Sequence, residues 1–94
     1  MAFIGYRLRG VDGELKGLWL TRIDVATKSG TTFLGSPNWL EVARRPTEFR
    51  INPRFHPDES WAWSGTTEEH AQTYQTILLS VGIRTEIVLP LAKT

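Results

Sequence analysis

One segment of the chain, residues 66–82, carries the signals for a complete amphipathic helix, and the other elements have to fit around it. Thr66 followed by Glu69 has the spacing of a capping box, in which each side chain bonds the other residue's free backbone N–H. Gly82 comes where a left-handed C-cap residue is favoured, so we expect a helix over about 67–81. Apolar residues recur every three or four positions between these ends and predict one buried stripe: Ala71, Tyr74, Ile77, Leu78 and Val81.

Strands are predicted on both sides of this helix. Trp61 and Trp63, which are two residues apart, are expected on one face of a short strand just upstream. Residues 83–89 have the composition of a further strand, which Pro90 ends. The sequence therefore predicts a strand–helix–strand unit built around one apolar layer.

The N-terminal part of the chain predicts a β-hairpin. Residues 3–9 alternate as a first strand should, with Ile4, Tyr6 and Leu8 on one face. Asp12-Gly13 is a strong hairpin signal because both residues tolerate positive φ, and residues 15–23 then form the returning strand. A helical interpretation of residues 15–23 stays open, although the interior Gly17 would cost such a helix about 1 kcal/mol.

A second helix is predicted in the middle of the chain, over about 37–45. Ser36 is a suitable N-cap, Pro37 is favoured at the first helical position, and Pro46 ends the element. Its inner face is expected to carry three residues: Trp39, Leu40 and Ala43.

Two further strands are expected around this helix. A turn at residues 28–30 leads into a short strand over residues 31–34. Residues 47–52 alternate, with Phe49 and Ile51 pointing inward. The prolines at positions 53 and 57 indicate a loop over residues 52–60.

About 4–6 short strands and two helices in 94 residues predict one α+β domain over residues 1–94, a small antiparallel sheet with both helices packed on one face. The chain has no cysteine, which excludes disulfides, thiolate zinc sites and cysteine nucleophiles. It shows no signal peptide and no apolar run near the about 20 residues that span a bilayer. We therefore expect a cytoplasmic protein that does not enter a membrane.

Charge is distributed unevenly along the chain. Residues 1–57 hold nine Lys/Arg against five Asp/Glu, and residues 58–94 hold two against five, so the first part carries +4 and the second −3. The basic part includes the residues that we single out as a candidate binding set: Arg44, Arg45, Arg50, Arg54 and Trp39.

Two interpretations of this basic and aromatic band are open. Arginines interleaved with Phe49, Phe55, Trp61 and Trp63 over residues 39–63 suit single-stranded nucleic acid, since they offer cations for phosphates and flat faces for bases. The same residues also suit a solvated basic face over an aromatic core, because helix C-termini favour cations and no RNA-recognition motif accompanies them.

The histidines are the remaining candidates for chemistry. His56 with Asp58 or Glu59 would suit a small hydrolase, although neighbours in sequence rarely form a catalytic set and Asp58 or Ser60 is expected to form a local turn. The spacing of His56 and His70 does not match a metal site, so we expect neither a metal nor another cofactor.

Because no catalytic set is evident, we expect a small non-enzymatic binding protein that covers a macromolecular partner. A protein partner with an acidic surface suits the basic set best. Inhibitors, immunity proteins and accessory proteins, including those encoded by phages and mobile elements, are typical of this size class. Nucleic acid is the alternative partner, and hydrolysis at His56 is the second alternative.

Overall fold

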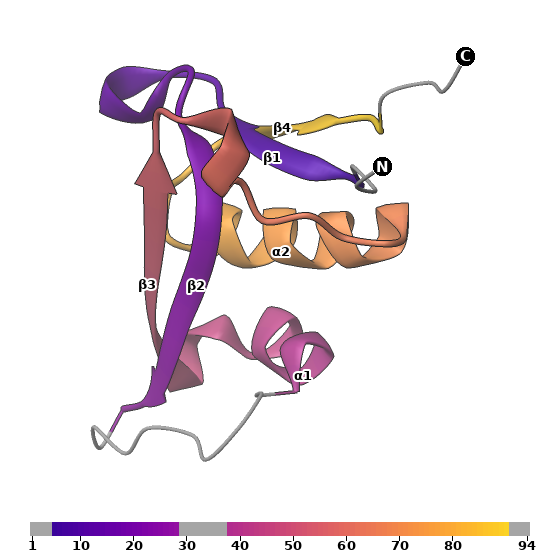
Figure 1. Cartoon of the computed structure of the whole chain (residues 1–94). Helices are drawn as coiled ribbons and strands as arrows, with labels where there is room; N and C mark the ends of the chain where they lie inside the picture. Colours follow the sequence, from indigo (N-terminus) through magenta and orange to yellow (C-terminus); the bar gives the residue numbers. More distant parts are fainter. Residues whose placement is uncertain (1–4, 29–37, 91–94) are drawn as a thin grey trace.

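The computed structural model describes residues 5–28 and 38–90, which form a four-stranded antiparallel sheet with two α-helices on one face (Figure 1). The strand order is β3-β2-β1-β4. The predicted α+β fold class is therefore confirmed. In chain order, with η for a 3₁₀-helix, the elements are β1 (Arg7–Gly10), η1 (Gly13–Leu15), β2 (Trp19–Thr27), α1 (Trp39–Arg44), η2 (Pro46–Glu48), β3 (Phe49–His56), η3 (Glu59–Trp61), α2 (Glu68–Ser80) and β4 (Thr85–Val88).

The sheet consists of two ribbons that meet at a steep angle. β2 and β3 form the long ribbon, β1 and β4 form the short one, and the Arg9–Trp19 strand pair joins them. Helix α2 lies in the angle between the ribbons (Figure 1). Beyond the joining pair, the segment after η3 fits between β1 and β2: the Trp63 N–H donates to the Leu20 carbonyl at 2.8 Å, and Gly65 exchanges two backbone hydrogen bonds of 2.9 Å with Tyr6.

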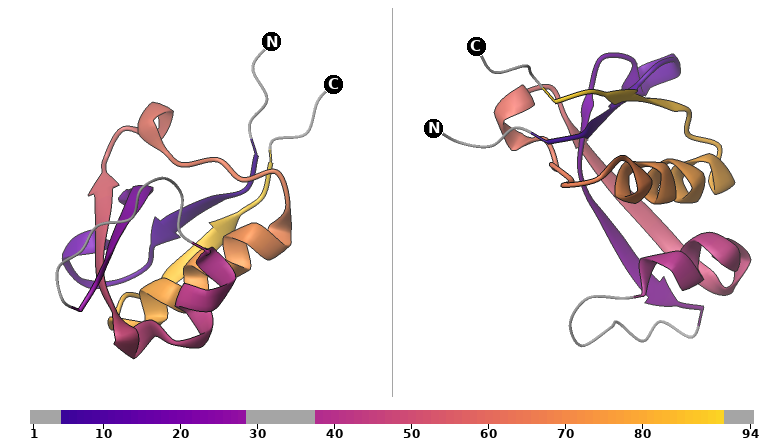
Figure 2. Two further views of the ribbon diagram at one scale, coloured as in Figure 1. Left: turned by 90° about the horizontal axis from the view of Figure 1, so that it is seen from below. Right: turned by 90° about the vertical axis from the view of Figure 1, so that its right-hand side faces the viewer.

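Alternation along the strands gives the sheet a covered side, which faces α1 and α2, and an opposite side. Figure 2 shows both helices on one side of the β2–β3 ribbon and η3 on the other. A β-bulge between Leu20 and Arg22 lets Leu20 and Ile23 point to the same side although they are three residues apart. The buried core lies on the covered side and contains Leu8, Leu20, Ile23, Val42, Ala71, Tyr74, Ile77 and Leu78.

Helix α2 confirms the central prediction, with two corrections at its ends. Thr67, not Thr66, is the N-cap, and its hydroxyl accepts a hydrogen bond from the His70 N–H at 3.2 Å, so the predicted capping box with Glu69 does not form. Val81 is the C-cap and is exposed instead of continuing the buried stripe. The helix ends in a Schellman motif, in which Gly82 (φ +82°) and Ile83 donate to the Leu79 and Leu78 carbonyls.

Helix α1 is shorter than predicted and buries a different residue. Its N-cap is Asn38, whose side chain accepts from the Glu41 N–H, so the expected start at Ser36 and Pro37 is wrong. Val42 is buried in the core, whereas Leu40 is 66% exposed and is not part of the inner face. Ser36, Pro37 and the strand predicted over residues 31–34 lie outside the described residues.

Three local predictions in the rest of the chain are also corrected. The strand expected at Trp61 and Trp63 does not form. Trp61 ends the 3₁₀-helix η3, and the chain after it is extended and bonds to β2 through the Trp63 N–H. The β1–β2 hairpin forms, but through η1 and not a two-residue turn, since Asp12 is extended and Gly13 alone of the two has positive φ. β3 continues to His56 through Pro53, which is tolerated because β3 is an edge strand.

Candidate binding face

The side of the sheet opposite α1 and α2, here called the open face, carries mainly polar and aromatic side chains. The strand register places them in rows, because residues paired across antiparallel strands project to the same side. One row runs Glu86, Arg9, Trp19, His56 across all four strands. Further rows on β2 and β3 pair Arg22 with Arg54, Asp24 with Asn52, and Ala26 with Arg50. Arg7, one row beyond Arg9 on β1, completes the open face.

The middle of the open face holds two arginines in place with one carboxylate. The two oxygens of Asp24 each receive a guanidinium, with Arg22 Nε at 3.2 Å and Arg54 Nε at 3.3 Å. All three side chains are well exposed, so these ion pairs contribute little to stability and serve mainly to orient the guanidinium groups. The row thus presents two adjacent cations whose remaining N–H donors are free to face a partner.

An exposed aromatic platform stands at the end of the neighbouring row, which His56 ends on β3. The indole of Trp61 stacks on the imidazole of His56, with ring centroids 4.6 Å apart and planes 8° from parallel. The Asp58 backbone N–H donates to Nδ1 of His56 at 2.9 Å and fixes the imidazole beneath the indole. Trp61 is 63% exposed, so a flat aromatic ring is available for contact on the same face as Arg54.

The turn that carries Trp61 is organised by Asp58. Its Oδ1 accepts hydrogen bonds from the Ser60 backbone N–H at 2.9 Å and from the Ser60 hydroxyl at 2.8 Å, as the predicted local turn requires. These two bonds lower the pKa of the Asp58 carboxyl below its ordinary 3.8, and the bond from the Ser60 backbone N–H has the larger effect. The Ser60 hydroxyl donates to the carboxylate and His56 Nδ1 accepts from the backbone, an arrangement that orders the loop.

A buried arginine anchors the other end of the open face. Arg7 is only 4% exposed, binds the carboxylate of Glu59 in η3, and lies with its guanidinium carbon 5.0 Å from the centre of the Trp19 ring. Arg9 approaches the same ring at 5.3 Å and also bonds Glu86 at 2.8 Å. The Arg7–Glu59 pair holds η3, and with it Trp61, against the sheet.

The structure divides the five binding residues that the sequence indicated. Arg50 and Arg54 alternate with the core-facing residues of β3 and lie on the open face. Arg44 and Arg45 belong to α1 and its C-cap on the covered side, where Glu41 lies 3.8 Å and 3.2 Å from them. Trp39 is half-buried and packs edge-on against Tyr74 at 4.9 Å.

Sequence reasoning missed several members of the open face. Arg22 was not singled out, because its closeness to Arg54 follows from a strand pairing that no local pattern specifies. Arg9 joins the same face through the Arg9–Trp19 pair. One available signal for an exposed aromatic residue was Trp61, because the two residues before it, Glu59 and Ser60, are polar.

No family model, curated protein or solved structure matches the chain. Within residues 5–28 and 38–90, no three His, Cys, Asp or Glu side chains gather as a metal site would require. None of the helices in that part of the chain has the length and apolar character to cross a membrane.

Proposed function

We propose that this protein is a small non-enzymatic binding protein that uses its open face to cover a protein partner with an acidic surface. The observation that carries the proposal is the Asp24-held pair Arg22 and Arg54 on the sheet face opposite α1 and α2, which also carries His56 with the exposed Trp61 stacked on it. Tryptophan and arginine dominate the binding energy of protein interfaces, especially where they lie together.

Charge on the open face supports an acidic partner. Arg7, Arg9, Arg22, Arg50 and Arg54 outnumber the acids that they contact there, which are Asp24, Glu59 and Glu86. Excess positive charge would speed the encounter with an acidic surface more than it would raise affinity. An inhibitor, immunity or accessory protein acting in the cytoplasm would work in this way, by covering the surface that its target needs.

The test is capture of the partner from the native host with tagged protein, in the presence of nuclease, followed by binding measurements with the purified partner. Arg22→Glu/Arg54→Glu reverses two charges on the open face, and Arg44→Glu/Arg45→Glu is the matched control on α1. We expect the first pair to abolish detectable binding and the second to leave affinity within about threefold, since exposed charges away from an interface contribute little. Loss of binding only in the α1 variant would overturn the proposal.

A single-stranded nucleic acid is the second candidate partner, favoured by the Trp61–His56 stack beside Arg54. Fluorescence anisotropy with labelled oligo(U) and oligo(dT) over a salt series tests it. If phosphates bind the arginines, log affinity falls linearly with log salt, and Trp61→Ala costs about 1–3 kcal/mol through lost base stacking. Binding that resists salt and survives Trp61→Ala would exclude this candidate.

A further inference from the structure

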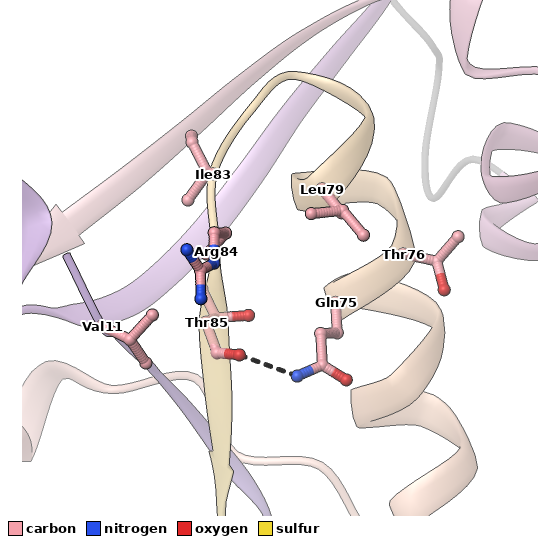
Figure 3. Close-up of a pocket in the computed structure, with 7 residues that line it drawn as sticks. All are labelled: Val11, Gln75, Thr76, Leu79, Ile83, Arg84 and Thr85. Carbon is pink, nitrogen blue, oxygen red and sulfur yellow. Dashed lines mark hydrogen bonds between the residues drawn. The ribbon is translucent and has the colours of Figure 1, made fainter. Parts of the chain in front are cut away.

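The outer edge of β4 has backbone groups that point away from the sheet. The Val11 N–H donates to the Arg84 carbonyl at 3.2 Å, and the register continues from this pair along β1 and β4. Because hydrogen-bonded and non-hydrogen-bonded pairs alternate, the backbone groups of Thr85 and Ile87 face outward. The Gln75 side chain confirms this direction by donating to the Thr85 carbonyl at 2.8 Å from the outer side (Figure 3).

Several features of this edge point to something that covers it. A groove of about 490 Å³ lies between α2 and β4, and Figure 3 shows its lining of Val11, Gln75, Thr76, Leu79, Ile83, Arg84 and Thr85. The hydroxyl of Thr85 is buried without a hydrogen-bond partner among the described residues. Leu79 beside the groove and Leu89 just beyond β4 are 60% and 63% exposed.

We propose that a second copy of this chain pairs with β4 in antiparallel fashion about a two-fold axis at Thr85. In that register Arg84 of each copy faces Glu86 of the other copy, so two symmetric ion pairs form. Ile83 faces Ile87 of the second copy on the covered side. The two Thr85 side chains lie directly opposite each other, where their hydroxyls can bond.

The charge pattern selects this register over its neighbours. A two-fold axis at Glu86 would set the two Glu86 carboxylates against each other, and an axis at Arg84 would oppose two guanidinium groups, both unfavourable arrangements. Gln75 need not leave, because a carbonyl oxygen accepts two hydrogen bonds. The present partners of these charges, Asp12 for Arg84 and Arg9 for Glu86, form exposed pairs that hold them weakly.

Pairing through β4 would produce a continuous eight-stranded sheet, twice the four strands of one chain. A two-fold axis perpendicular to the sheet keeps both open faces on the same side. The dimer would therefore offer two copies of the open face to one large or symmetric partner, which raises avidity without a new type of contact.

Sedimentation equilibrium of the full chain and of charge-reversed variants tests the proposal. We expect the wild-type chain to form dimers, and Arg84→Glu or Glu86→Arg alone to weaken dimerisation about tenfold or more, because each change opposes like charges twice. Mixing the two single variants restores opposite charges at both contacts, so they should form a heterodimer with near wild-type affinity. The variant carrying both changes should also dimerise.

Circular dichroism of each variant establishes that it is folded, and Arg54→Glu on the open face serves as a control that should dimerise normally. A wild-type chain that stays monomeric up to millimolar concentration would overturn the proposal. A dimer that is indifferent to both single reversals, or mixed variants that do not associate, would also overturn it. None of these results depends on whether the open face binds a partner.

Discussion

The two faces of the β2–β3 ribbon are made by alternate residues of the same strands and yet differ in burial and charge. On the covered side, Leu20 and Ile23 are buried against α1 and α2. On the open face, Arg22 and Arg54 share one carboxylate and remain largely exposed. Burial stabilises the fold through apolar area, whereas exposed ion pairs add little. Stability and the proposed recognition are therefore assigned to neighbouring residues that can be changed separately.

The largest expected effect tests the covered side directly. Leu20→Ala should lower the free energy of unfolding by about 2–5 kcal/mol, because truncation of a fully buried leucine leaves a cavity. Arg22→Ala, two positions away on the open face, should change it by no more than about 0.5 kcal/mol. Urea titrations followed by tryptophan fluorescence measure both. Equal losses in the two variants would mean that the faces are not divided as described.

A smaller loss of stability is expected at Arg7, an open-face residue that is buried and not exposed. Arg7 lies on that face but is buried, with Glu59 as its charged partner. Glu59→Gln should lower the free energy of unfolding by about 1–2 kcal/mol, because a buried guanidinium loses its counter-charge while water partly screens the site. Glu14→Gln, in the exposed η1 helix, is the control and should be neutral. An unchanged Glu59→Gln variant would show that Arg7 does not need this partner.

The helix that covers the inner face allows a matched comparison of two adjacent residues. Thr67→Ala should destabilise the protein by about 1 kcal/mol, because the His70 N–H loses its capping oxygen. Thr66→Ala should be neutral within about 0.5 kcal/mol, since Thr66 lies outside the cap. Thermal unfolding measures the stability of both variants. A larger loss of stability in Thr66→Ala than in Thr67→Ala would show that Thr66, not Thr67, is the N-cap.

The smallest effect concerns pH and the turn that carries Trp61. Because the pKa of Asp58 is lower in the folded protein than its ordinary 3.8, the folded state binds this proton more weakly than the unfolded state. The stabilisation is fully present above pH 3.8 and is lost as the pH falls through the lower, folded pKa. Asp58→Asn should therefore make stability decline less steeply in acid. Unfolding free energies measured over a pH series check this, and parallel curves for the two proteins would contradict it.

The sequence predicted elements whose determinants are local. Helix α2 was placed within one residue at each end, because Gly82 and a threonine cap mark its limits. Thr66 and Thr67 are chemically equivalent as caps, so only the geometry of the chain could choose between them. The inward direction of Phe49 and Ile51 likewise followed from simple alternation.

Errors arose where a distant segment decides the local structure. Pro53 indicated a loop, but its strand lies at the edge of the sheet, and the strand order is not written in any local pattern. Trp61 and Trp63 were predicted to share one face. In the structure the Trp63 N–H bonds to the Leu20 carbonyl, whereas the Trp61 ring stacks on His56 on the open face. Of the residues that the sequence proposed for binding, Arg50 and Arg54 lie on the open face, and Arg22 could not be added from the sequence because its place there depends on the same long-range pairing.

The β-bulge in β2 bears on how this chain tolerates insertions and deletions. Thr21 is the extra residue, and its hydroxyl binds the Arg54 carbonyl at 3.1 Å. Deleting that single threonine would leave Leu20 and Ile23 two residues apart, the spacing that puts both on one face of a regular strand, so the residues that follow in β2 would keep their sides. Loss of one codon at this position would thus be milder than loss of one among the regularly paired residues 22–27, where it would move the side chains that follow to the opposite face.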